Sequence, residues 1–313
     1  MVCKSAKSTL LTFPFRPFFV DVLSSFITSA KFTRHEFEEY VAPVIEGDVI
    51  SAEADPAVRA LELAHALAFR NGLGSSLFAP AHGSFSAADV KSFAASALAK
   101  SNIAVLGTGI ELSVLAQLVE KSLGSAAVTS TASSPSSTYY GGEHRVASHG
   151  GPQTVFIGFG VAGEPSAELA TLAALLSPRP SIKWSKGISA FASAIPEGTS
   201  VQSVYLPYSD ATLVGLLVQG QTASSVKEAG KAAAQALKNA AATGGVSPEE
   251  LKKAVAKAKF AAANVLDSRE GLISVLGTKV CCLDCFYHTT ALPQSFIGFG
   301  WLRCLSCSGS STI

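Results

Sequence analysis

The chain has 313 residues, of which 48% are apolar and 15% charged, and its 24 Lys and Arg nearly balance its 23 Asp and Glu. This composition excludes a disordered chain and leaves room for two domains of ordinary size, each with its own core. The charge balance excludes an extensive basic surface for nucleic acid, and no apolar run reaches the roughly 20 residues needed to cross a bilayer.

The first half of the chain is predicted to be mainly helical. Apolar residues at helical spacing predict a helix over residues 18–30. Thr33 and Glu36 form a capping box that begins an acidic helix reaching about Ala54, which Pro43 is expected to kink or divide. The elements that follow are a helix beginning at Pro56, a loop over 72–84, a helix over 86–99, a buried strand over 103–106 and a helix over 110–123.

The second half reads as strands and helices, after a segment at 124–151 that is rich in Ser, Gly and Pro and is interpreted as an interdomain linker. Strands are predicted over 153–161, 200–206 and 212–218, the last two as antiparallel neighbours. Helices are predicted over 166–176, 223–242 and 248–267. This order indicates an α+β fold, with helices covering one face of a mostly antiparallel sheet.

Two short motifs resemble functional sites without completing them. Gly107-Thr108-Gly109 follows the predicted strand, but Leu112 stands where a dinucleotide-binding fingerprint needs its third glycine. His35-Glu36-Phe37-Glu38-Glu39 begins like a zinc-peptidase motif, but Glu39 replaces the second histidine in either reading direction. We therefore interpret the first as a glycine-eased turn and the second as a solvated acidic helix face.

Glu46 and Glu53 are seven residues apart, so an unbroken helix would place both carboxylates on one face. Such a pair can ligate a metal only with further ligands, and alone it is typical of a surface stripe. His65, His82, His144 and His149 lie in separate segments, none beside an obvious nucleophile, and are interpreted as structural or surface histidines.

The sharpest local motif is a pair of cysteine pairs. Cys282 and Cys285 are followed by Cys304 and Cys307, with the C-x2-C-x18-C-x2-C spacing of a zinc ribbon. The stretch between the pairs is apolar and has little turn chemistry. A structural zinc site, and with it a zinc-ribbon adaptor function, stays an open alternative at this point.

Five ordered segments carry a resemblance to a known family. They are residues 60–80, 101–109, 138–145, 205–215 and 244–250, which read ALELAHALAFRNGLGSSLFAP, SNIAVLGTG, TYYGGEHR, YLPYSDATLVG and GGVSPEE. Together they resemble the core protein 2 family of the cytochrome bc1 complex, an inactive branch of the insulinase/pitrilysin-type metallopeptidase superfamily. The resemblance spans about residues 18–280.

The resemblance implies two similar layered α+β domains, each with a mostly antiparallel sheet covered by helices. We expect residues 18–123 to be the second half of the first domain, 124–151 a linker and 152–280 a truncated second domain. Residues 1–17 and the Cys-rich 281–313 do not follow the family, which suggests a misjudged gene model and makes the cysteine motif an accident. In active relatives His-x-x-Glu-His lies in the missing opening half, and the helix with Glu46 and Glu53 supplies the distal carboxylate ligand.

The function implied by the resemblance is that of a non-catalytic structural subunit of respiratory complex III, which is part of an oxidoreductase complex. Its implied partners are the other core protein and the remaining subunits of a homodimeric complex, with no nucleic acid. Its implied place is the matrix side of the mitochondrial inner membrane, peripheral and without a transmembrane segment, although no targeting sequence is recognisable. No catalytic, cofactor-binding or metal-ligating residue is assigned. The alternative is a zinc endopeptidase subunit like the mitochondrial processing peptidases.

Overall fold

The computed structural model describes residues 16–80, 85–99, 103, 105–107, 110–124, 136–147, 151–178, 195–242 and 244–282. The chain folds into two compact units. The sheet unit contains Ile45–Ala81 and Pro135–Val265, and the helical unit contains Cys3–Val44, His82–Ser134 and Leu266–Ile313. The predicted division into 18–123 and 152–280 stays a prediction, because residues from both of its halves belong to the sheet unit.

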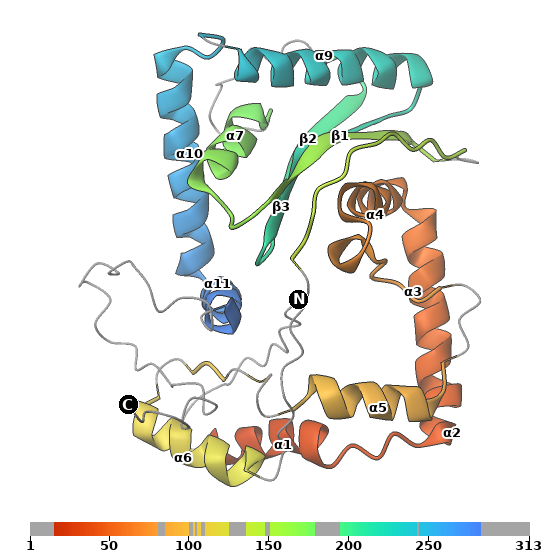
Figure 1. The fold of residues 1–313 in the computed structure, drawn as a ribbon, viewed down its shortest axis with the longest axis vertical. Coiled ribbons are helices and arrows are strands. Elements are labelled where there is room, and N and C mark those ends of the chain that lie inside the picture. Colours follow the sequence, from red (N-terminus) through yellow and green to blue (C-terminus); the bar gives the residue numbers. More distant parts are fainter. Residues whose placement is uncertain are drawn as a thin grey trace. The chain divides into compact units, whose positions relative to one another are not determined.

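The centre of the sheet unit is a three-stranded antiparallel sheet in the order β1-β3-β2 (Figure 1). Its strands are β1 (Gln153–Ala162), β2 (Thr199–Pro207) and β3 (Ala211–Gly220). A short turn joins β2 to β3, closed by a hydrogen bond from the N–H of Tyr208 to the carbonyl of Ala211. The three predicted strands and the antiparallel pairing of the last two are confirmed, and the fold is α+β.

Helices cover both faces of this sheet. Successive residues of a strand point to opposite faces. Leu216 and Val218 of β3 lie in a core cluster with α7 (Ala167–Leu176) and α9 (Ala223–Ala241), whereas Ala211 and Leu213 lie in a second cluster with the end of α4 (Pro56–Phe69). The prediction of helices on one face was therefore incomplete. The signal for the second layer was the nearly continuous apolar run of β3, which is typical of a strand buried on both sides.

Glycines allow close packing on the face that α4 covers. Gly158 and Gly215 are register partners in β1 and β3, and the end of the Phe156 ring lies 2.7 and 2.6 Å from the places where their Cβ atoms would be. Gly160 lies under Phe69 in the same way, with 3.0 Å between that ring and the place of a Cβ. Side chains at these positions would push the aromatic rings off the sheet.

The helices of the second half follow the predicted order. Ser166 and Thr222 cap α7 and α9 through their side chains, as expected of N-cap residues. The ammonium of Lys257, on α10 (Pro248–Asp267), donates to the carbonyl of Ser177 at the end of α7. α11 (Arg269–Cys282) was not predicted, because its apolar residues do not gather on one side of the helix.

The helical unit has a smaller core. Leu115, Val119 and Leu123, one per turn of α6 (Leu112–Leu123), form a cluster that Ile27 of α1 (Arg16–Thr28) packs against. At the start of α5 (Ala87–Ala97), Ser86 and Asp89 are bonded to each other's backbone N–H and form a capping box.

The predicted strand over 103–106 was wrong, since the described residues 103, 105 and 106 have no strand structure. Ile103 and Val105 pack instead against the α6 cluster. Their apolar character reflects burial, and the three strands of the described sheet pair only with one another.

Pro43 acts as the sequence predicted, by interrupting a helix. The short α2 (Arg34–Glu36) leads into one π-helical turn, Phe37–Val41, before α3 (Ala42–Ala54) continues. A proline at position 43 has no N–H to give and clashes with the carbonyl four residues earlier. The wider π turn accommodates this with a bond from the N–H of Ala42 to the carbonyl of Phe37.

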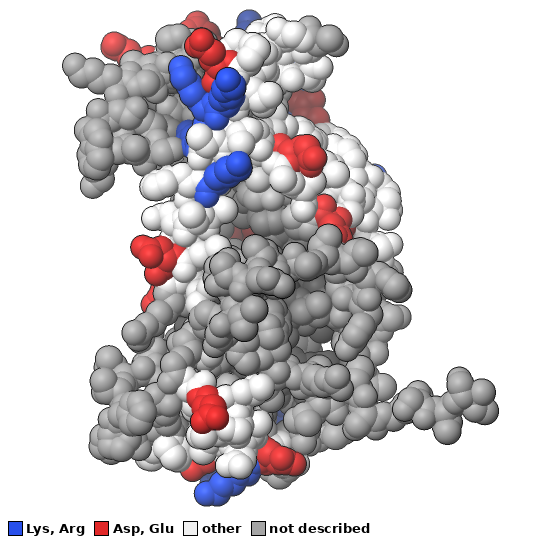
Figure 2. Space-filling model, turned by 90° about the vertical axis from the view of Figure 1, so that its left-hand side faces the viewer, with Lys and Arg blue, Asp and Glu red and all other residues white. Residues whose placement is uncertain are grey.

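No helix in the described part of the chain is long and apolar enough to cross a bilayer. Figure 2 shows acidic and basic side chains scattered among the described residues of the face drawn, in keeping with a formal net charge of +1.

Candidate functional site

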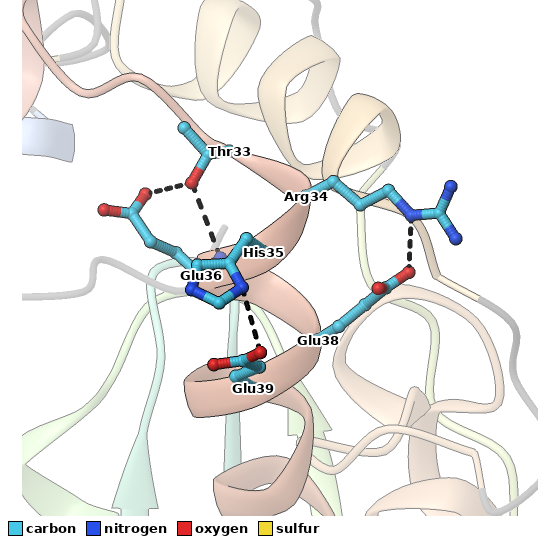
Figure 3. A network of polar contacts seen from close by, with 6 residues as sticks. All are labelled: Thr33, Arg34, His35, Glu36, Glu38 and Glu39. Atoms are coloured by element: carbon cyan, nitrogen blue, oxygen red, sulfur yellow. Dashed lines mark hydrogen bonds and ion pairs between the residues drawn. The ribbon is translucent and has the colours of Figure 1, made fainter.

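The incomplete zinc-peptidase motif lies on an exposed helix start (Figure 3). The hydroxyl of Thr33 accepts from the N–H of Glu36 and donates to its carboxylate, and this second bond is the main reason why the pKa of Glu36 is lowered. His35 Nδ1 lies 3.0 Å from the Glu39 carboxylate, and both side chains are more than half exposed. The interpretation as a solvated acidic helix face is confirmed for the residues drawn.

The second acidic pair is divided between two environments. Glu46 and Glu53 are both exposed on α3, and Glu53, unlike Glu46, lines the hollow described next. The hollow has a volume of about 370 Å³ and lies between α3, α4 and the loop after Gly74. Its lining residues are Val49, Ala52 and Glu53 of α3, Arg59 and Glu62 of α4, and Ser76, Phe78, Ala79 and Pro80 of the loop.

Glu62 is not free to bind a ligand, because its Oε1 accepts from the Ser76 hydroxyl at 2.8 Å and from the Leu77 N–H at 3.0 Å. Arg59 and Glu53 form no ion pair within the described part of the chain. The hollow therefore offers one unpaired guanidinium and one unpaired carboxylate beside apolar side chains.

These residues do not fit the zinc of active relatives. A catalytic zinc site needs three protein ligands, usually with imidazole among them. The described residues contain no group of three His, Cys, Asp or Glu side chains that could hold a metal. The hollow also contains the positive charge of Arg59, which repels a divalent cation.

His65 has a structural environment in the sheet unit. Its Nδ1 lies 2.7 Å from the carbonyl of Leu61, so in a neutral ring the proton is on Nδ1. Its Nε2 then accepts from the hydroxyl of Tyr208, also at 2.7 Å. Partial burial raises the pKa of that tyrosine. This hydrogen bond joins α4 to the turn between β2 and β3.

The predicted linker contributes to the same junction. Residues 136–147 have no helix or strand, but they are attached to both sides of it. The N–H of Tyr140 donates to the carbonyl of Ala68 at 2.7 Å, and the guanidinium of Arg70 lies 4.3 Å from the centre of the Tyr140 ring. The N–H of Ser137 donates to the Asp210 carboxylate at 2.8 Å. Sequence reasoning missed these contacts, whose only local signal was the aromatic pair Tyr139-Tyr140.

The remaining sequence candidates do not converge on a site. His144 is exposed, whereas His82 and His149 lie outside the described residues. Cys282 ends α11, and Cys285, Cys304 and Cys307 also lie outside them, so the cysteine motif stays a prediction. Gly107 is in an irregular segment, and its partner Gly109 is not described.

Comparison with known proteins identifies relatives over most of the chain. Residues 84–258 match the family described as the peptidase M16 inactive domain. The chain is 42% identical over 267 residues to the mitochondrial cytochrome b-c1 complex subunit 2 of Cryptococcus neoformans. The aligned region covers 83% of this chain and 61% of that protein. The chain is 36% identical over 266 residues to the protein of the same name from Yarrowia lipolytica (84% and 63%), and 38% identical over 266 residues to that of Neurospora crassa (81% and 56%). The chain thus spans about three fifths of the length of these curated relatives.

Proposed function

The chain belongs to the peptidase M16 family, and on that basis we propose that it serves as a non-catalytic structural subunit of the cytochrome b-c1 complex, respiratory complex III. The observation that carries the proposal is the match of residues 84–258 to the domain of this family that is described as inactive. Relatives that carry the name of subunit 2 support it, at identities of 36% to 42% over more than 260 residues.

In this role the chain supports the assembly of the complex rather than electron transfer. Its partners would be the other core protein and the remaining subunits of a homodimeric complex III. Its place would be the matrix side of the mitochondrial inner membrane, as a peripheral subunit. We also propose the domain division of the family, with the second half of a first peptidase-like domain in residues 18–123 and a truncated second one in 152–280.

The finer proposal is that the chain has no catalytic, cofactor-binding or metal-ligating residue. Its sequence contains no His-x-x-Glu-His, and the described hollow beside Glu53 combines that carboxylate with Arg59. A zinc endopeptidase subunit is the alternative. It would need two imidazoles beside the glutamate, and neither Glu46 nor Glu53 has a histidine among its described polar contacts.

An affinity-tagged chain expressed in a fungal host that lacks its own subunit 2 tests the proposal. We expect the chain to migrate with complex III on native gels and to purify with cytochrome b and cytochrome c1. The same preparation should cleave no fluorogenic peptide when zinc is added. Recovery of the chain alone would refute the structural role. Zinc-dependent cleavage that Glu53→Gln abolishes would establish the peptidase alternative.

A further inference from the structure

The hollow between α3 and α4 has the composition of a small-molecule site. Its volume of about 370 Å³ lies at the lower end of the range of roughly 300–1,000 Å³ that ligand pockets occupy. Val49 and Ala52 of α3 line one side, and Phe78 and Pro80 of the loop line it as well. A single compact molecule with an apolar portion would fit against these side chains.

Two opposite charges at the hollow lack a partner within the described residues. The guanidinium of Arg59 and the carboxylate of Glu53 both line it, and neither forms an ion pair. Glu62 already accepts two hydrogen bonds at one of its oxygens, from Ser76 and from the backbone of Leu77. A ligand with a single charge would satisfy only one of the two free groups and leave the other beside a charge of its own sign.

We propose that this hollow binds a small zwitterion of the class of free α-amino acids with an apolar side chain. Arg59 holds the carboxylate, because its planar fork matches two carboxylate oxygens. Glu53 accepts from the ammonium, and the apolar side chain lies against Phe78, Ala52 and Val49. The proposal does not depend on the role in complex III, since it uses only residues of the sheet unit.

Four probes test the proposal on the full chain by ligand-observed saturation-transfer NMR. All four have the same apolar side chain. L-leucine carries both charges, leucine amide lacks the carboxylate charge, N-acetyl-leucine lacks the ammonium charge, and N-acetyl-leucine amide lacks both. We expect saturable binding of L-leucine with a dissociation constant in the millimolar range, and a roughly tenfold higher dissociation constant when either charge is removed. Equal binding of all four probes, or no saturable binding of L-leucine, would overturn the proposal.

Variants assign the two charges to their residues. Arg59→Gln should remove the preference for L-leucine over leucine amide, and Glu53→Gln the preference for L-leucine over N-acetyl-leucine. The matched controls are Glu46→Gln, on the same helix outside the hollow, and Arg145→Gln, whose side chain is 87% exposed and paired with a glutamate. Both controls should bind like the unmodified chain. Equal losses in the controls would contradict the proposal. If a variant fails to fold, the four probes on the unmodified chain still decide the matter.

Discussion

Replacing Phe69 by alanine should separate α4 from the sheet. The Phe69 side chain is 2% exposed and belongs to the cluster with Ala211 and Leu213 of β3. Its ring lies directly on the backbone of β1, because Gly160 has no side chain to keep it away. Removing the ring leaves a cavity between a helix and a paired strand, neither of which can move to fill it.

The expected loss is large relative to the stability of a domain. Truncation of a buried phenylalanine to alanine costs about 3–5 kcal/mol, which combines the lost transfer free energy with the cost of the cavity. The total free energy of unfolding of a domain is about 5–15 kcal/mol. We therefore expect Phe69→Ala to remove at least about a fifth of the stability of the sheet unit, and about two fifths at the middle of both ranges.

The assay is urea unfolding followed by circular dichroism at the helical band, with Phe93→Ala as the matched control. Phe93 lies on α5 and is 71% exposed, so its truncation should change the free energy of unfolding by less than about 0.5 kcal/mol. Similar changes in the two variants would refute the packing of α4 on the sheet. Loss of cooperativity in Phe69→Ala alone would support it.

Three further perturbations test other parts of the sheet unit. Tyr208→Phe removes the hydroxyl that donates to His65 and should destabilise by about 1–2 kcal/mol in urea unfolding. Partial burial raises the pKa of Asp210, but the hydrogen bond from the N–H of Ser137 contributes to a larger lowering, so the pKa in the folded chain is below its ordinary value. The stabilisation from this carboxylate is therefore present above about pH 4, and it is lost as the pH falls through the lowered folded pKa. In Asp210→Asn, the midpoint temperature of thermal unfolding should therefore fall less steeply as the pH is lowered below about 4. Gly215→Ala should prevent correct strand pairing. Its control is Gly47→Ala, which has open space around it in α3 and should stabilise by about 0.5–1 kcal/mol.

Each of these has an outcome that would contradict it. Tyr208→Phe should cost no further stability in a His65→Leu background, and equal costs in both backgrounds would exclude the hydrogen bond as the cause. An unchanged pH dependence of the midpoint temperature in Asp210→Asn would show that this carboxylate does not titrate with folding. A soluble Gly215→Ala chain with native amide exchange in β3 would contradict the close approach of β1 and β3 at this position.

Elements with a strong local signal were predicted within a few residues. The starts of the helices predicted over 86–99 and 166–176 and the interruption at Pro43 depend on atoms a few residues away, so the sequence is sufficient to predict them. The strand over 103–106 was wrong because a short apolar run indicates burial without indicating a partner strand. The resemblance to the metallopeptidase superfamily is confirmed by the family match of residues 84–258. It rested on five ordered segments, so one wrong local prediction did not affect it.

The candidate site was only partly predictable. The pattern identified Glu53 as a residue of interest through its spacing from Glu46, but it gave no sign that Arg59 and Glu62 would lie beside it. These residues come together because the chain changes direction between α3 and α4, at Asp55 and Pro56, and because the loop that ends at Pro80 lines the same hollow. Which side chains share a hollow depends on such turns, and one spacing along the chain cannot determine it.

The sequence by itself determined the family, the α+β class and the order of most elements, because periodicity, caps and turn residues act over a few positions. Only the tertiary structure decided that α4 covers the second face of the sheet and that residues 136–147 join the two. The physical reason is that these contacts join residues far apart in the sequence. They are the packing of Phe69 on the sheet and the hydrogen bonds made by Tyr140, Ser137 and His65. Each pairs groups that are separated by tens of residues and brought together by packing alone.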